Sequence, residues 1–253
     1  MTNATQLSVQ HSCSDCGFRK SDFFCELPEP VLKVFESIKI PMNYPKGTSL
    51  FLEGDSASGV YTLCRGKIKM STHSADGRAL ILRISGPGEW LGLSAVIAGR
   101  THEATAEVIE NCQINFVRKQ DFLRFIREYP DAGLSALRQL SVDYQHAYTQ
   151  ICSLGLSSSV SDKLAKLLMT WCADRSAATG TELNGSPIKL KLTFSHEEIA
   201  EMIGTSRETV TRMLKDFRER GLITLKGADL VIPNYRTLER SIGTRGRSSR
   251  SIM

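Results

Sequence analysis

The chain has 253 residues, of which 41% are hydrophobic and 23% charged, and its net charge is +5. That length suffices for two ordinary domains, and the balance excludes a chain that is disordered throughout. Its apolar runs fall short of the ~20 residues of a membrane span, and its N-terminus lacks the basic start and apolar stretch of a signal peptide. We therefore expect a cytoplasmic protein without a membrane partner, and the positive charge mildly favours a polyanionic one.

The first region, residues 1–26, is polar and carries three closely spaced cysteines, Cys13, Cys16 and Cys25. The chain has seven cysteines, and an odd number in a cytoplasmic protein favours free thiols and a metal site over a disulfide framework. Packing rarely accounts for three cysteines so close together in polar sequence. The residues alone leave open a zinc site, a redox switch of free thiols, and a complete or vestigial cluster site.

The second region, residues 27–128, alternates short strand-like stretches with glycine turns. Val60–Cys64 and Ala79–Ile84 are such stretches, and Asp76-Gly77 is a typical two-residue hairpin turn. Short strands at this spacing predict an antiparallel β-barrel.

Residues 130–156 have helical periodicity. Apolar residues recur there at alternating spacings of three and four, which is the pattern of a two-stranded coiled-coil seam. Polar neighbours such as Ser141, Asp143 and Gln150 keep the seam narrow, so we expect a dimerisation helix rather than a core helix packed on its own domain. The expected seam consists of Leu137, Leu140, Tyr144, Ala147, Ile151 and Leu154.

Residues 157–238 have the pattern of a winged helix-turn-helix domain. Ser161 is the expected N-cap of a helix over residues 162–174. Further on, Ser195 caps one helix, Gly204 supplies a tight turn, and Ser206 caps the next helix. Residues 221–232 are expected to form the β-hairpin wing. The remaining residues, 239–253, are basic and of low complexity, which predicts a disordered tail.

The helix that follows Ser206 is expected to bury Val210, Leu214 and Phe217 and to expose a polar, mostly basic face. Outward side chains near the N-terminal end of a recognition helix reach base edges in the major groove. Arginine can bind guanine O6 and N7 together, and glutamate can accept from cytosine N4. The candidate DNA-binding residues are Ser206, Arg207, Glu208, Thr211, Arg212 and Lys215.

The sequence disfavours two other interpretations of this region. A solvated amphipathic helix pair is disfavoured because caps, turn glycine, buried face and basic face agree across residues 192–223. An enzyme is disfavoured because the sequence offers no nucleophile–base pair, phosphate loop or set of catalytic carboxylates, and its five histidines are scattered. We therefore expect a non-enzymatic DNA-binding protein.

The segment Thr205–Arg212 closely resembles the recognition helix of the cyclic-AMP receptor / fumarate-nitrate regulator (CRP/FNR) superfamily of transcription regulators. The resemblance extends to nearly the whole chain, through the glycine turns at residues 54–55, 65–66 and 86–92. It implies an α+β fold with a jelly-roll sensor barrel of the cyclic-nucleotide-binding type, a dimerisation helix and a winged helix-turn-helix. It also implies that Arg207, Glu208 and Arg212 contact bases directly.

Relatives that bind cyclic AMP offer a glutamate to the ribose and an Arg-Ser pair to the phosphate. At the matching places this chain has Leu93 and Glu103, and a carboxylate repels a phosphate at short range. Arg100 is nearby, but loop arginines are usually solvated. We therefore do not expect a cyclic nucleotide as the effector.

The spacing Cys13-x2-Cys16-x8-Cys25 resembles the cysteine cluster of oxygen-sensing FNR-type regulators, which hold a [4Fe–4S] cluster. That resemblance implies a fourth ligand on the strand over residues 106–117, where Cys112 is the available thiol. The ligand of the family aligns nearer Asn115, however, and strand alternation places Cys112 on the apolar face, so a core thiol is the alternative. The other cysteines, Cys64, Cys152 and Cys172, are expected in the core or the seam.

Together these features predict a homodimer that binds double-stranded DNA at a palindromic operator, with RNA polymerase as a further partner. Its expected input is redox or oxygen sensing through an iron–sulfur cluster held by Cys13, Cys16, Cys25 and Cys112. The alternatives are a regulator with free thiols that has no effector or responds to a small molecule or cyclic nucleotide, and a zinc-stabilised interaction module.

Overall fold

A computed structural model of the protein describes residues 12, 13, 16, 23–157, 159–180, 183 and 187–242. The chain divides into two compact units, Met1–Ala147 and Tyr148–Met253. Most of the N-terminal segment 1–26, and the tail from residue 243 onward, lie outside the described residues. Across the described part of the chain, no helix has the length and apolarity needed to span a membrane.

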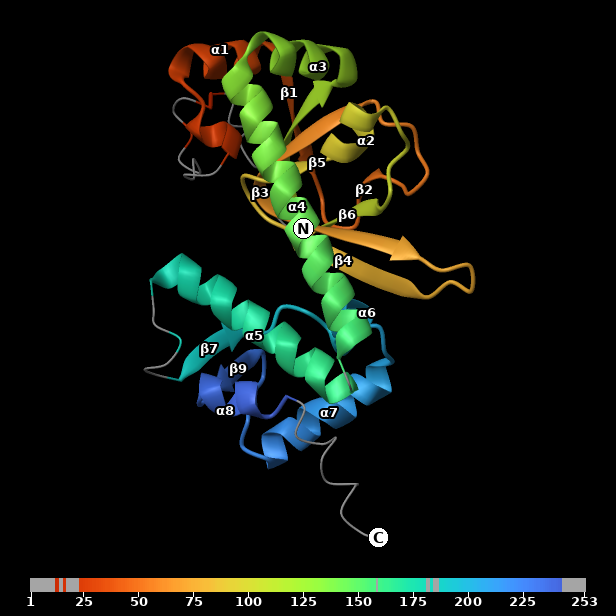
Figure 1. Cartoon of the computed structure of the whole chain (residues 1–253), viewed down its shortest axis with the longest axis vertical. Helices are drawn as coiled ribbons and strands as arrows, with labels where there is room; N and C mark the ends of the chain where they lie inside the picture. Colours follow the sequence, from red (N-terminus) through yellow and green to blue (C-terminus); the bar gives the residue numbers. More distant parts are fainter. Residues whose placement is uncertain are drawn as a thin grey trace, which may run out of the picture. The chain divides into compact units, whose positions relative to one another are not determined.

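An antiparallel sheet forms the body of the first unit (Figure 1). Its strand order is β1-β6-β3-β4, with β2 paired to β6 and β5 paired to β3. The long strands β3 and β6 pair with each other over most of their length. This sheet confirms the barrel-type fold that the alternating pattern predicts. The strands are β1 (Lys39–Tyr44), β2 (Ser49–Phe51), β3 (Gly59–His73), β4 (Ala79–Ser85), β5 (Trp90–Leu91) and β6 (Thr105–Arg118).

An aromatic core joins the helices of the first unit to its sheet. Trp90 is fully buried at its centre, and its ring lies 4.2 Å from that of Phe24, 5.6 Å from Phe35 and 5.3 Å from Phe122, between centroids. Such ring pairs contribute about 0.5–1.5 kcal/mol each beyond the area they bury. Phe24 therefore anchors the end of the N-terminal segment on the barrel. The helices are η1 (Phe23–Glu26), α1 (Glu29–Ile38), α2 (Leu93–Ala98), α3 (Lys119–Glu128) and α4 (Pro130–Leu156).

A second apolar core lies on the sheet and includes the fully buried side chains of Leu63, Cys112 and Ile114. The Cys112 thiol donates to the backbone carbonyl of Glu110 at 3.0 Å. Gly66 is required beside it, because its φ is +96° and a Cβ there would lie 2.6 Å from the Cys112 Sγ. Cys112 is thus tightly packed within the barrel.

The second unit combines helices with a three-stranded antiparallel sheet of order β7-β9-β8. The N-cap of α5 is Ser159, whose side chain accepts from the Asp162 backbone N–H, and not Ser161 as the sequence suggested. Ser159 has the extended backbone that an N-cap needs, whereas Ser161 already lies inside the helix. The elements are α5 (Val160–Thr179), β7 (Ile188–Lys191), α6 (His196–Ile203), α7 (Arg207–Glu219), β8 (Thr224–Lys226), β9 (Asp229–Ile232) and α8 (Tyr235–Arg240).

The C-terminal boundary also differs from expectation. The helix α8 ends at Arg240, so the stretch 239–253 that was expected to be disordered begins inside a helix. Asn234 explains this, because its side-chain Oδ1 accepts from the Thr237 backbone N–H at 3.0 Å and caps the helix.

Candidate functional site

The turn between α6 and α7 is defined by caps that the sequence predicts. Ser195 and Glu198 form a capping box at the start of α6, each side chain accepting a backbone N–H of the other residue. Gly204 ends α6 in the left-handed conformation, with φ +63°. Ser206 Oγ then accepts from the Thr209 backbone N–H and begins α7. These caps fix where α7 starts and therefore which of its residues face outward.

The helix α7 has one buried face and one exposed face. Val210, Leu214 and Phe217 are buried in the second unit, as expected. The structure brings the candidate DNA-contacting side chains together, because all of them are solvent-exposed on this helix or at its cap. They are Ser206, Arg207, Glu208, Thr211, Arg212 and Lys215.

Local contacts order several of these exposed side chains. Thr211 Oγ1 donates to the Arg207 carbonyl at 3.0 Å and lies 2.8 Å from the His196 Nδ1 of α6. Hydrogen bonds from its own backbone N–H and from the Ser206 hydroxyl hold the pKa of Glu208 below its usual range. Glu208 is therefore a carboxylate acceptor at neutral pH. The hairpin of β8 and β9 follows, in the place of the expected wing.

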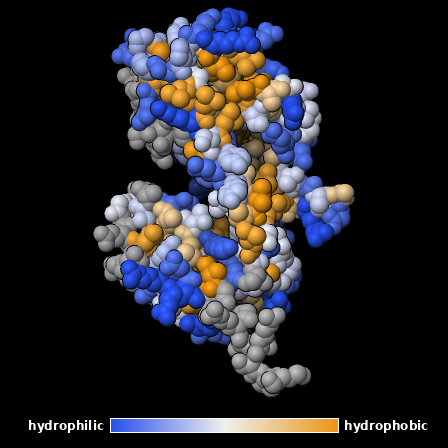
Figure 2. Space-filling view, viewed as in Figure 1, coloured by the Kyte–Doolittle hydropathy of each residue, from blue (hydrophilic) through white to orange (hydrophobic). Residues whose placement is uncertain are grey.

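The exposed face of α4 contains four of the six residues of the predicted dimerisation seam. Leu137, Tyr144 and Ile151 are 64%, 70% and 68% exposed, and Ala147 is exposed as well. Figure 2 shows apolar side chains on the surface along the course of this helix. Large apolar side chains left in water on a regular helical spacing are typical of a surface that another chain covers.

The other two seam positions are used within the chain itself. Leu140 is half-buried against the aromatic core of the first unit, and Leu154 is half-buried near Gly204 in the second. Leu134 and Tyr148, which are 47% and 60% exposed, take their places on the open face. The exposed stripe of α4 therefore consists of Leu134, Leu137, Tyr144, Tyr148 and Ile151.

Four cysteines line one cavity in the first unit. Cys13 and Cys16 come from the N-terminal segment, Cys25 from η1 and Cys64 from β3. The Cys16 backbone N–H donates to the Cys13 carbonyl at 3.4 Å, so a single turn carries these two thiols. None of the seven cysteines, all of which are described, forms a disulfide. The other lining residues are Phe24, Leu32, Phe35, Thr62, Leu63, Gly88 and Asn115.

Burial and charge both act on the thiols of this cavity. Lys39 Nζ donates to Cys13 Sγ at 2.9 Å, and the Cys13 backbone N–H donates to the Glu36 carboxylate. Burial raises the pKa of Cys13, and the Lys39 ammonium opposes that rise. Burial, together with the nearby thiols of Cys13, Cys16 and Cys25, raises the pKa of Cys64 to about 12 against the opposing effect of Lys39. The Cys64 thiol is thus within electrostatic reach of the other three thiols.

The structure separates Cys112 from the three N-terminal cysteines. Cys112 packs in the core on the sheet and is absent from the residues that line the cavity. This is the position of a core thiol, the alternative to cluster ligation that the strand pattern offers. Cys64 occupies the cavity instead, although sequence reasoning placed it in the core or seam. One signal could have found it: Cys64 has the parity of Thr62, which pairs with Asn115, where the family ligand aligns. Using it requires knowing that β3 pairs with β6.

The residues that the resemblance matches to a cyclic-nucleotide site, Leu93 and Glu103, contact other residues of the first unit. Ser94 Oγ donates to Glu103 Oε1 at 2.8 Å, and Leu93 is buried. Next to them, the His102 ring stacks on Phe51 with centroids 3.7 Å apart. Burial lowers the pKa of His102. By the resemblance, Leu93 therefore stands where the ribose would need an acid, and Glu103 stands where the cyclic phosphate would need donors.

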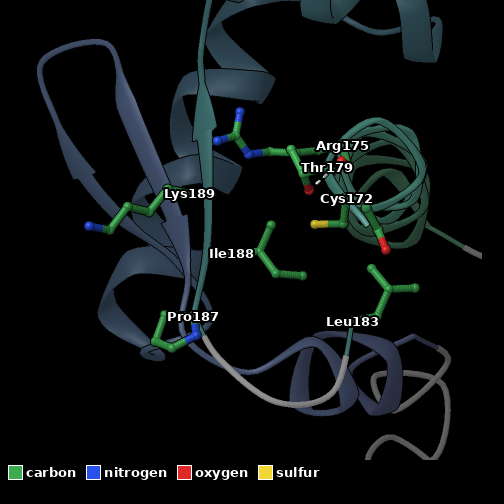
Figure 3. Close-up of a pocket in the computed structure, with 8 residues that line it drawn as sticks. Cys172, Arg175, Thr179, Leu183, Pro187, Ile188 and Lys189 are labelled. Atoms are coloured by element: carbon green, nitrogen blue, oxygen red, sulfur yellow. Dashed lines mark hydrogen bonds between the residues drawn. The ribbon is translucent and has the colours of Figure 1, made fainter. Parts of the chain in front are cut away.

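A second cavity, of about 210 Å³, lies between α5 and β7 (Figure 3). The Cys172 Sγ points into it toward Ile188, whereas the charged ends of Arg175 and Lys189 point away. Burial raises the pKa of Cys172 to about 11. Among the described residues that line it, none belongs to α6 or α7. This cavity is a packing feature of the second unit rather than part of the exposed face of α7.

Two family profiles match the chain in succession. The profile for the cyclic nucleotide-binding domain matches residues 41–129, and the profile for the Crp-like helix-turn-helix domain matches residues 162–241. The first covers most of the barrel, and the second covers the unit that contains α6 and α7.

Curated relatives and solved structures agree with this order of domains. A CRP-like cAMP-activated global transcriptional regulator of Mycobacterium tuberculosis is 28% identical over 200 residues, covering 79% of this chain and 87% of the relative. The nitrogen fixation regulation protein FixK of Bradyrhizobium diazoefficiens is 29% identical over 216 residues, covering 85% and 87%. The c-di-GMP responsive global regulator CLP of Xanthomonas campestris has the same fold, with a TM-score of 0.70 at 21% identity, covering 82% of this chain and all of that one. The chain belongs to the CRP/FNR superfamily of transcription regulators.

Proposed function

We propose that the protein is a non-enzymatic transcription regulator of the cytoplasm that reads double-stranded DNA through α7. The observation that carries this proposal is the exposed face of α7, which gathers the candidate contacts at the start of a helix whose other face is buried. A recognition helix enters the major groove with this part.

The residues at the start of α7 suit base reading. Arg207 can bind guanine O6 and N7 through its planar guanidinium, and Glu208 can accept from cytosine N4. Arg212 lies further along the exposed face and serves as a third base reader, while Lys215 supplies charge to phosphate. We expect inverted half-sites resembling TGTGA, separated by about one helical turn.

The exposed stripe on α4 supports a homodimer. Two linked recognition helices bind a palindrome with the advantage of effective concentration, because the second helix is held near its half-site. We propose that this stripe is the dimer surface and that RNA polymerase is the partner of the DNA-bound dimer.

For the input we propose redox sensing at Cys13, Cys16 and Cys25, with an iron–sulfur cluster as the cofactor. Thiolates are the usual ligands of such clusters, and a cavity lined by thiols close to a lysine fits that donor set. A bound cluster supplies one-electron redox chemistry. The Ser94–Glu103 pair disfavours a cyclic nucleotide as the effector.

Selection of binding sites from random DNA tests the proposed function. We expect wild-type protein to enrich two-fold-symmetric sites with TGTGA-like halves, and Arg207→Ala to relax preference at one guanine position. Enrichment of TTGAT half-sites, or an unchanged preference in Arg207→Ala, would show that the wrong reader has been assigned. Absence of any enriched palindrome would contradict the dimeric DNA-binding function itself.

A further inference from the structure

Cys64 lines the cavity from β3, whereas the other three thiols come from the N-terminal segment and η1. It follows Thr62 by two positions in β3, and both line the cavity together with Asn115 of β6, which pairs with Thr62. The β3–β6 register shifts between Leu63 and Arg65, so Cys64 is the extra residue of a β-bulge. A bulge disrupts the ladder locally, and the Cys64 thiol lines the same cavity as Thr62.

We propose that Cys64, rather than Cys112, is the fourth thiolate ligand of an iron–sulfur cluster that Cys13, Cys16 and Cys25 also hold. This inference rests on the proposed redox input and completes its site. Cys112 has the opposite parity to Asn115 on β6 and is fixed in the core by its contacts with Glu110 and Gly66.

Polar groups around the cavity suit a negatively charged sulfur site. Asn115 Nδ2 donates to Cys64 Sγ at 3.0 Å, as Lys39 Nζ does to Cys13 Sγ at 2.9 Å. Donors to ligand sulfurs stabilise thiolates and tune cluster potentials. Thr62 Oγ1 and Asn115 Oδ1 are buried without a hydrogen-bond partner among the described residues. A buried polar atom of this kind is costly in a cavity that stays empty, and the Thr62 hydroxyl is available as a further donor.

The arrangement of the thiols favours a cluster over a single ion. Within the part of the chain that is described, no three His, Cys, Asp or Glu side chains are grouped tightly enough to hold one metal ion. Zinc needs four ligands at about 2.3 Å from one centre when they are thiolates. A cluster places its own iron and sulfide atoms between its ligands, so its thiolates do not have to converge on one centre.

Ligation at Cys64 would also couple two distant parts of the sequence. Cys25 lies beside Phe24, which packs on Trp90, and Cys64 lies on the central strand β3. Holding the cluster would therefore add a second tie between the N-terminal segment and the barrel to the one that Phe24 makes.

The test compares cluster content in anaerobically purified full-length wild type, Cys64→Ser, Cys112→Ser and Cys172→Ser. Iron and acid-labile sulfide per chain and the visible absorbance are measured, with circular dichroism and thermal unfolding as checks of folding. We expect iron, sulfide and brown absorbance in wild type, Cys112→Ser and Cys172→Ser, and near-complete loss in Cys64→Ser. The two controls replace buried thiols, one in each unit, so they separate ligation from general destabilisation.

A rescue variant covers the case in which Cys64→Ser folds poorly. Because the Asn115 side chain contacts the Cys64 Sγ, Cys64→Ser/Asn115→Cys returns a thiol to the same wall and is expected to regain iron and sulfide. Wild-type iron and sulfide content in Cys64→Ser would overturn the inference and leave the proposed redox input standing. Zinc in place of iron and sulfide in wild type, or neither, would overturn both, whereas DNA selection tests α7 independently.

Discussion

The recognition helix and the cysteine cavity represent opposite ways to build a site. On α7 the candidate contacts are neighbours in sequence, exposed to water and charged, which suits a polyanion that brings its own hydration and counterions. In the cavity the thiols come from residues 13 to 64, are partly buried, and are shielded by aromatic side chains. The candidate DNA-reading site therefore depends on local helix geometry, whereas the candidate sensing site depends on tertiary packing.

The largest expected effect concerns α4, because binding to a palindromic site requires a dimer that carries two copies of α7. Replacing Tyr144 and Ile151 with glutamate puts charge on the exposed stripe and should give monomers. Loss of linkage between half-sites should lower operator affinity by about 10²–10⁴-fold. Light scattering and binding isotherms measure both effects. Gln145→Glu, on the same helix but off the stripe, is the control that should stay dimeric, and a dimeric double variant would refute the stripe.

The next effect concerns DNA recognition by Arg207 and Lys215 of α7. Arg207→Ala should lose about 1–3 kcal/mol of discrimination at one guanine position, because a bidentate contact is removed. Lys215→Ala is the matched control: it should weaken all sequences similarly and reduce the salt slope of binding by about one. Both follow from isotherms on a panel of single-base operator variants at two or more salt concentrations. Equal, sequence-independent losses in both variants would mean that Arg207 contacts phosphate.

The smallest expected effect is a pH dependence of the stability of the first unit. Burial lowers the pKa of His102 in the folded protein. As the pH falls below the ordinary histidine pKa of about 6.5, the unfolded chain therefore binds more protons than the folded one. The first unit loses stability over this range, until the pH falls below the pKa of His102 in the folded protein. His102→Gln should remove this dependence, while His73→Gln, at an exposed position, should keep it. In a Trp171→Phe background, Trp90 fluorescence reports urea unfolding of the first unit alone. Identical pH profiles in the two variants would contradict the assignment.

The features that could be predicted from the sequence are those formed by residues that are close together in the chain. The caps at Ser195 and Ser206, the turn at Gly204 and the buried face of α7 all lie within residues 192–223, so helix chemistry alone predicts them. The alternating strand pattern likewise predicted the antiparallel barrel. Among the serines at the start of α5, however, only the backbone conformation distinguishes the N-cap Ser159 from Ser161.

The features that could not be predicted are those that depend on contacts between segments far apart in the chain. Leu140 and Leu154 fit the helical seam, yet each packs within its own unit, which no periodicity can reveal. Cys64 was missed because its position depends on the β3–β6 pairing, on a bulge, and on how η1 docks through Phe24. Cys112 drew attention only because it lies on the strand where the family's ligand is expected.

The most direct test of the account asks whether the cysteine cavity controls α7. Operator affinity is measured for one anaerobic preparation before and after air bleaches its visible absorbance, with Cys64→Ser treated in parallel. The account predicts that wild-type affinity changes by about 5–150-fold, the usual range of coupling between two sites, and that Cys64→Ser shows one affinity throughout. Identical wild-type isotherms before and after complete bleaching would contradict it.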